Sequence, residues 1–238
     1  MTNNGLINYT SLFCVALVWM SCGTPSSPDP IENSAQEAAA PSPMLVILDA
    51  ERTGINFVNR VIEDDSANYL NYRYIYNSGG VATGDLDNDG LPEIVCVSNR
   101  NGGAIYKNNG DLKFSDVTKT AGFNLVGLWA TGVCMMDANA DGLLDIYVCG
   151  SGPGYWPVTY RRNRLYINKG ALKFVDEAAE RGVADEGHHT AASFADLDGD
   201  GDLDVFILAH RVDFKNLNNA ITDPRFLPVA DQSDRLYL

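Results

Sequence analysis

The sequence has 238 residues, of which 45% are hydrophobic, and it carries a formal net charge of −14 at pH 7. This length and composition allow a hydrophobic core and exclude a chain that is disordered throughout. The negative charge argues against nucleic acid as a partner, because its phosphates would be repelled, and against a polybasic membrane-binding surface.

Residues 1–22 are predicted to form a lipoprotein-type signal peptide. The apolar run LFCVALVWM, residues 12–20, is too short to span a bilayer, which takes ~20 apolar residues. Ser21 and Cys22 follow it, an ending that resembles a bacterial lipobox, although Trp19 stands where leucine is commoner. Cys22 is therefore the expected lipid acceptor, and the alternative is an ordinary signal peptide with an incidental cysteine. The protein is expected to be secreted and held at a bacterial cell envelope, at the outer membrane or the cell surface.

Residues 23–43 are rich in proline, serine and alanine. Such a composition buries too little apolar surface to order itself, so we predict a disordered linker. The linker would act as a tether between the lipid anchor and a folded domain at residues 44–238.

One short acidic pattern occurs three times in that domain, as DLDNDGLPE at 85–93, DANADGLLD at 137–145 and DLDGDGDLD at 196–204. The copies start 52 and then 59 residues apart, and a tyrosine-containing landmark follows each of them. This spacing predicts a repeat protein. Like charges so close together repel one another, and desolvation on folding raises the cost unless a cation lies among them.

The loop chemistry predicts calcium, at about three sites. Calcium takes ~6–8 oxygen ligands, which a loop can supply from side chains at positions 1, 3 and 5, a carbonyl at position 7 and a further carboxylate, with glycine at position 6 for the sharp turn. An EF-hand is excluded because its twelfth residue would be Cys96, Val148 or Ile207, and magnesium is disfavoured because it rarely takes an all-protein cage. The predicted ligands are Asp85, Asp87, Asp89, the Leu91 carbonyl and Glu93; Asp137, Asn139, Asp141, the Leu143 carbonyl and Asp145; and Asp196, Asp198, Asp200, the Asp202 carbonyl and Asp204.

Each acidic loop is flanked by short β-forming segments. GGVATG, ATGVCMM and TAASFA precede the loops, and IVCV, IYVC and VFIL follow them. The tyrosine landmark predicts a third strand and the LKF segment a fourth, with Asn-Gly or Lys-Gly turns between them. Four antiparallel strands in a unit of about 55 residues describe a propeller blade.

At GGVATGDLDNDGLPEI, TGVCMMDANADGLLDIYV and AASFADLDGDGDLDVFIL the sequence resembles the FG-GAP or VCBS repeat proteins. It is most similar to the bacterial branch that resembles cartilage acidic protein and often ends in an ASPIC/UnbV domain. The likeness covers about residues 52–238 and implies an all-β fold, a β-propeller of the integrin α-subunit type with about three four-stranded blades. It also implies calcium in the hairpins and partners that dock on the other face. The chain departs from the family pattern at Glu93, where aspartate is usual, and it contains no ASPIC/UnbV segment.

The series of repeats is predicted to be incomplete in this sequence. INFVN, residues 55–59, aligns with LKFSD at 112–116 and LKFVD at 172–176, so it is predicted to be an outer strand that precedes any blade of its own. The third unit stops at RLYL, residues 235–238, before its LKF segment. Closed propellers have ~4–8 blades. We therefore predict the N-terminal part of a longer propeller, which would aggregate through open blade faces when expressed alone.

The leading functional hypothesis is a calcium-binding envelope protein that acts as a binding or adhesion module for a protein or glycan ligand. The alternatives are a non-catalytic propeller within a larger secreted enzyme and a structural envelope protein. No GxSxG, HExxH, Walker or GxGxxG element occurs in a supporting context, so the chain is not predicted to be an enzyme. The loop GPGYWPVTYRR, residues 152–162, is the first choice for a contact surface, and His188 and His189 are expected to be loop residues.

Overall fold

The structure, a computed structural model, describes residues 45–77, 79–210, 212 and 233–238. The predicted signal peptide, Cys22 and the linker lie outside these residues. All the helices and strands belong to one compact unit, residues 47–238. Among the described helices, none has the length and apolar character needed to cross a membrane.

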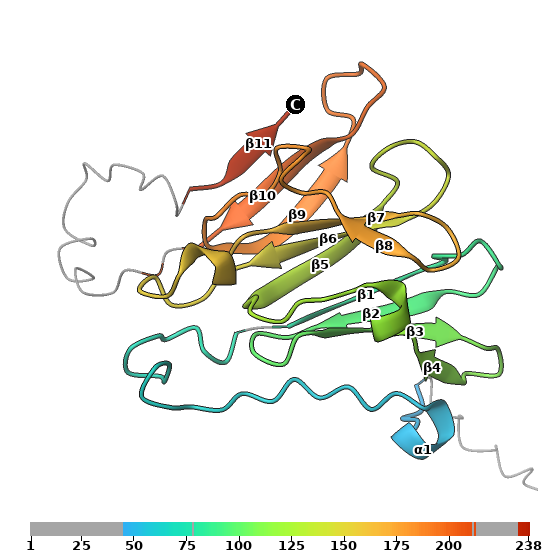
Figure 1. Cartoon of the computed structure of the whole chain (residues 1–238), viewed down its shortest axis with the longest axis horizontal. Coiled ribbons are helices and arrows are strands. Elements are labelled where there is room, and N and C mark those ends of the chain that lie inside the picture. Colours follow the sequence, from blue (N-terminus) through green and yellow to red (C-terminus); the bar gives the residue numbers. More distant parts are fainter. Residues whose placement is uncertain (1–44, 78, 211, 213–232) are drawn as a thin grey trace, which may run out of the picture. The chain divides into compact units, whose positions relative to one another are not determined.

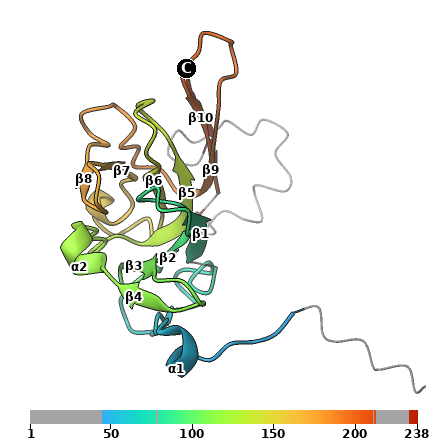
Figure 2. The same ribbon diagram turned by 90° about the vertical axis from the view of Figure 1, so that its right-hand side faces the viewer.

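The unit is built from three antiparallel sheets that follow one another in chain order (Figures 1 and 2). Within each sheet, neighbouring strands are also neighbours in sequence, as in a propeller blade. The first sheet contains β1 (Gly80–Gly84), β2 (Glu93–Val97), β3 (Gly103–Asn108) and β4 (Phe114–Asp116). The second contains β5 (Ala130–Met136), β6 (Asp145–Gly150), β7 (Arg164–Asn168) and β8 (Phe174–Asp176). The third contains β9 (His189–Ala195), β10 (Asp204–Ala209) and β11 (Arg235–Tyr237).

The predicted all-β architecture of repeated blades is thus confirmed, with two four-stranded sheets and a third that has three described strands. The helices are short: α1 (Ala50–Thr53), α2 (Thr118–Ala121) and the 3-10 helix η1 (Val158–Tyr160). An EF-hand loop would have Cys96, Val148 or Ile207 as its twelfth residue. These residues lie inside β2, β6 and β10, which agrees with the rejection of that motif.

The hydrophobic core lies between successive sheets. Strand β6 is buried along its whole length, and its alternate residues face different neighbours. Ile146 and Val148 pack with Val95 and Val97 of the first sheet, whereas Tyr147 and Cys149 pack in a second cluster that includes Val205 and Ile207 of the third. Because side chains alternate across a strand, a continuous apolar run such as IYVC suits a sheet that is covered on both faces.

The first strands of the three sheets, β1, β5 and β9, lie next to one another. The approach between β5 and β9 is close enough to require glycine, since a Cβ atom added to Gly132 would lie 2.4 Å from the carbonyl oxygen of Thr190. Beside it, the hydroxyl of Thr131 donates a hydrogen bond of 2.6 Å to the carbonyl of His189. These contacts fix the spacing of adjacent sheets, and with it the spacing of the acidic loops.

The prediction of a strand at residues 55–59 is wrong. These residues form no strand, and no described strand pairs with them. A strand needs a neighbour to satisfy its backbone groups. Here the backbone N–H of Asn56 donates instead to the hydroxyl oxygen of Tyr106 on β3, at 3.2 Å.

Candidate metal sites

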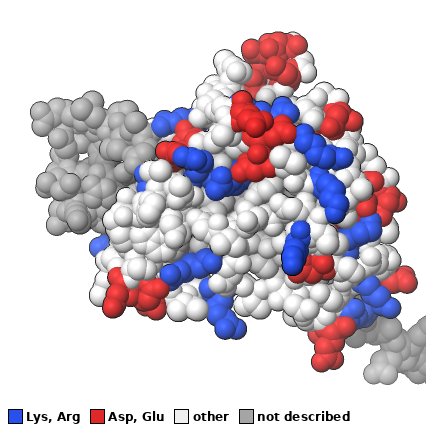
Figure 3. Space-filling view, in the orientation of Figure 1, with Lys and Arg blue, Asp and Glu red and all other residues white. Residues whose placement is uncertain are grey.

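The three acidic loops connect the first two strands of each sheet, β1 to β2, β5 to β6 and β9 to β10. Each loop therefore lies at the same end of its sheet. Figure 3 shows acidic side chains gathered at the top of the molecule, where the β9–β10 loop lies in Figure 1. The fold thus presents the three predicted sites in equivalent positions.

The three loops share one backbone conformation. Positions 4 and 6 have positive φ in every copy, a region that favours glycine. Glycine occupies position 6 throughout, as predicted, but position 4 is glycine in the third loop alone. The φ angles are 58°, 56° and 83° at Asn88, Ala140 and Gly199, and 87°, 84° and 100° at Gly90, Gly142 and Gly201.

The first aspartate of each loop turns its carboxylate toward the loop backbone. Asp85 accepts hydrogen bonds from the N–H groups of Asp89 (3.1 Å) and Gly90 (2.8 Å). Asp137 accepts the equivalent pair, at 3.1 and 2.8 Å, and Asp196 accepts from Gly199 and Gly201 at 2.6 and 3.2 Å. The loop thus wraps around a carboxylate, with oxygen atoms concentrated on its inner side.

The last acidic residue of each loop, Glu93, Asp145 or Asp204, is buried at the start of a strand. Each accepts a hydrogen bond from the N–H of the second loop residue, at 2.8, 2.9 and 2.7 Å in turn. Glu93 and Asp145 also accept from the backbone N–H of Asn108 and Asn168, at 3.2 and 2.7 Å. This carboxylate therefore fastens the loop to the third strand of its own blade.

The asparagines of the third strand are site residues that the sequence analysis missed. The side-chain amide of Asn108 donates to the carbonyl of Pro92 (3.0 Å), and that of Asn168 donates to the carbonyl of Leu144 (3.1 Å). Both asparagines thus form a hydrogen bond with the carbonyl of the eighth residue of the acidic loop. The signal was present in the shared Tyr-x-Asn of the landmark, at 106–108 and 166–168.

Burial raises the pKa of the Glu93 and Asp145 carboxyls. The hydrogen bonds from backbone N–H groups oppose this shift, whereas neighbouring loop carboxylates add to it. The charged form is thus disfavoured by both desolvation and repulsion. A bound cation would favour the charged form and so oppose this shift.

Two of the loops bring three carboxylates together. Oxygen atoms of Asp85, Asp87 and Glu93 lie within 4.8 Å of one another, and so do those of Asp196, Asp198 and Asp204. Such hard oxygen ligands suit calcium. In the second loop Asn139 replaces an aspartate, and its backbone-facing oxygen accepts from the N–H of Asp141 at 3.2 Å. The position-7 carbonyls stay predicted ligands, those of Leu91, Leu143 and Asp202. The position-5 carboxylates also stay predicted ligands, those of Asp89, Asp141 and Asp200. In each loop the position-5 carboxylate accepts a hydrogen bond from the N–H of the position-7 residue.

A lysine side chain from β3 contacts the carboxylates of the first loop. The ammonium group of Lys107, on β3, contacts the Asp87 carboxylate and lies 3.0 Å from Asp89 Oδ2. Hydrogen bonds to these two aspartates hold the pKa of Lys107 above its usual value. The second repeat has Ile167 at this position in the landmark. The first loop is therefore partly neutralised by a lysine that the second lacks.

The expectation of loop histidines holds for His188, which precedes β9, and is wrong for His189, the first residue of that strand. Both side chains are buried. His189 Nε2 lies 3.2 Å from Asp185 Oδ1, and its Nδ1 lies 3.0 Å from Asn163 Oδ1. Asp185 in turn accepts from Arg235 and Tyr237 of β11. This polar cluster joins the second and third sheets.

The described cysteines form no disulfide: Cys96, Cys134 and Cys149 are free thiols. Burial raises the pKa of all three thiols, to about 12 for Cys134. Cys149 belongs to the core cluster between the second and third sheets, and Cys134 packs against it.

Comparison with known proteins gives three curated relatives, all named cartilage acidic protein 1. The Xenopus tropicalis protein is 29% identical over 132 residues, the Homo sapiens protein 27% over 132 and the Mus musculus protein 29% over 136. Each match covers 55% of this chain and 19–20% of the relative, so the chain spans about a fifth of their length.

A solved structure concerned with recognition of non-reducing terminal N-acetylglucosamine by an Agrocybe aegerita lectin aligns with 55% of this chain and 32% of its own. Its TM-score of 0.31 and identity of 23% support no statement about fold or ligand.

The FG-GAP-like repeat profile matches residues 69–148 and 155–207, which include all three acidic loops and most of the described strands. More than half of the sequence is thus accounted for by this repeat, in agreement with the sheets and loops described above. The chain belongs to the FG-GAP-like repeat family.

Proposed function

We propose that the chain is a calcium-binding repeat module that recognises a ligand at a bacterial cell envelope. The observation that carries this proposal is the recurrence of one loop conformation three times, with three carboxylates gathered in two of the loops. Calcium would bind the hard oxygens of these loops and neutralise their repulsion. The module would thereby gain a rigid face opposite the surface that contacts its ligand.

Isothermal titration calorimetry with the chelator-treated chain tests the metal part of the proposal. We expect calcium to bind, with the third loop as a strong site, and magnesium to bind much more weakly. The variant Asp196→Asn should lose the third site, whereas Asp111→Asn, which lies in the β3–β4 turn outside the loops, should bind calcium like the parent. An absence of calcium binding by the folded parent would refute the proposal.

Lys107 should weaken calcium binding at the first loop. A metal ion must displace its ammonium group from Asp87 and Asp89, or share those carboxylates with it at the cost of repulsion. Lys107→Ile, which copies the second repeat, should raise the calcium affinity of the first loop by about fivefold, since partly exposed charge pairs contribute ~1 kcal/mol. Lys113→Ile, in the adjoining turn, is the matched control. Equal affinity in parent and Lys107→Ile would show that the lysine does not compete.

We further propose that Cys22 carries a lipid that holds the module at the envelope, on the basis of the lipobox-like sequence that ends there. In a bacterial host, Cys22→Ala should move the protein from the membrane fraction to the soluble fraction and abolish incorporation of labelled palmitate. Cys14→Ala, within the apolar run, should change neither. A parent protein that takes up no label would contradict this assignment.

A further inference from the structure

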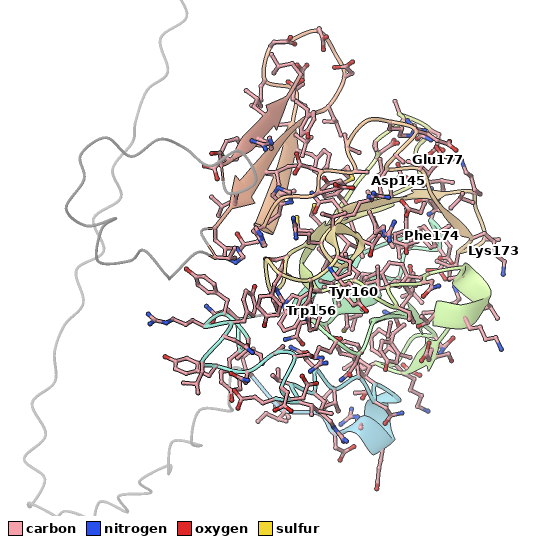
Figure 4. All side chains as sticks on the ribbon, turned by 60° about the vertical axis from the view of Figure 1, so that its left-hand side comes forward. Asp145, Trp156, Tyr160, Lys173, Phe174 and Glu177 are labelled. Carbon is pink, nitrogen blue, oxygen red and sulfur yellow. The ribbon has the colours of Figure 1, made fainter. Side chains whose placement is uncertain are left out.

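A cavity of about 500 Å³ lies where the first two sheets meet, at the strand ends opposite the acidic loops. One wall follows β2, another precedes β5, and a third comes from the loop between β6 and β7. This volume lies within the ~300–1,000 Å³ usual for small-molecule sites. The lining includes Asn99, Arg100, Val126, Leu128, Trp156 and Tyr160. Figure 4 shows Trp156 and Tyr160 close together, and Asp145 farther along the second sheet.

Asn99 supplies a buried polar atom that lacks a partner. Its side chain is 2% exposed and its amide nitrogen donates to the carbonyl of Ile75 at 2.9 Å. No described residue donates to its Oδ1. A buried acceptor left unpaired costs ~1–3 kcal/mol. This oxygen is shielded from solvent, so a ligand hydroxyl or N–H group would recover this cost only after the atoms that cover it move aside.

Arg100 supplies donors but little net charge. Its Nη1 lies 2.8 Å from Asp64 Oδ2 and donates to the carbonyl of Ile62 at 2.7 Å. Its guanidinium carbon lies 5.5 Å from the centre of the Trp156 ring. The other residues that line the cavity are uncharged. An anion would therefore gain little here, and the chain's net charge of −14 would repel it.

Aromatic rings give the cavity a fixed apolar wall. The indole N–H of Trp156 donates to the carbonyl of Ser66 at 3.1 Å, and its ring packs against Trp129 with centroids 5.5 Å apart. The ring centroids of Tyr160 and Trp156 are 5.0 Å apart, and the Tyr160 residue is 36% exposed. Since Arg100 lies over the Trp156 ring, Tyr160 offers the accessible aromatic surface. Both aromatic residues belong to residues 152–162, the predicted contact loop.

We infer that this cavity binds a neutral sugar ring. The apolar face of a pyranose can pack on Tyr160, while one hydroxyl accepts from Arg100 and another donates to Asn99 Oδ1 once the atoms that cover this oxygen move aside. A purely apolar ligand would leave the buried Asn99 oxygen unpaired, and an acidic one would meet an arginine that is already neutralised. This inference deepens the proposed function by naming the ligand class, and rests on it only for the role of the site.

Saturation-transfer-difference NMR tests the inference with the purified chain in calcium. The probes are the methyl glycosides of glucose, galactose, mannose, fucose and N-acetylglucosamine, together with glucuronate and N-acetylneuraminate as acidic probes. We expect saturation transfer to at least one neutral glycoside. Tyr160→Ala should weaken its affinity about tenfold through the loss of one aromatic contact. Tyr76→Ala makes the same substitution at a tyrosine that is 60% exposed and does not line the cavity, and should leave the affinity unchanged.

Asn99→Ala should also lose binding, and its melting curve shows whether it has folded. Three outcomes overturn the inference: no transfer to any neutral glycoside, equal affinity in Tyr160→Ala and the parent, or binding confined to the acidic probes. Calcium binding without sugar binding would refute this inference alone. Sugar binding by a chain that binds no calcium would refute the proposed metal sites and leave the cavity assignment standing.

Discussion

Removal of calcium with EDTA should lower the melting temperature of the calcium-loaded chain, and added calcium should restore it. Without the ion, the carboxylates gathered in the first and third loops repel one another with no compensating cation. At ~100 times its dissociation constant, a ligand that binds only the folded state contributes ~2.7 kcal/mol per site. For a domain of this size that corresponds to a shift of about 5–10 °C per occupied site.

Differential scanning calorimetry provides the measurement, and magnesium provides the first control. Magnesium should restore little of the lost stability, because it rarely accepts a cage made entirely of protein ligands. Asp196→Asn should lose part of the calcium-dependent increment, since it removes one of the three gathered carboxylates of the third loop. An identical melting curve before and after EDTA, in protein shown to contain calcium beforehand, would mean that the loops are closed by hydrogen bonds alone.

The strands were predictable because each acidic loop fixes the position of its neighbours. An apolar run such as IYVC, directly after a loop of known length, has few alternatives to a buried strand. Each tyrosine landmark likewise begins in the third strand of its sheet, β3, β7 or β11. INFVN has the same order of apolar and polar residues as LKFVD but no described neighbour to pair with, so this pattern alone led to the wrong assignment. Strand formation there depends on a partner, which the local sequence does not specify.

The ligand residues of the candidate sites could be predicted from the sequence, but the contacts that surround them could not. Asp85 and Asp196 could be identified from spacing, because the spacing follows from the loop's backbone turns. The contact of Lys107 with Asp87 could not, because it depends on the register between β2 and β3. The cavity at Asn99 and Trp156 combines segments from two blades, and a pattern within one repeat carries no information about it.

Replacement of Asp145 by leucine should destabilise the chain by about 2–4 kcal/mol even in EDTA, and by more in calcium, since Asp145 is also a predicted ligand. The change keeps the branching of the side chain but replaces both acceptor oxygens with larger methyl groups, so the N–H groups of Ala138 and Asn168 lose their partner. Each unpaired buried group costs ~1–3 kcal/mol. Part of this cost is offset because the variant no longer buries a charge, the same desolvation that raises the pKa of Asp145. The hydrogen-bond loss is the larger effect, since two donors are left unpaired and one carboxylate is removed.

Asp141→Leu, in the same loop, is the matched control. Asp141 is exposed and accepts two hydrogen bonds, from the N–H of Leu143 and the side-chain amide of Asn139, both at 2.9 Å. In EDTA its replacement should cost about 1 kcal/mol, because water can replace both bonds at this exposed position. Urea unfolding of both variants, in calcium and in EDTA, separates the two roles of the loop carboxylates. If Asp145→Leu unfolds like the parent in EDTA, the last acidic residue acts only as a metal ligand. If it is already destabilised in EDTA, that residue connects the acidic loop to the blade before any metal binds.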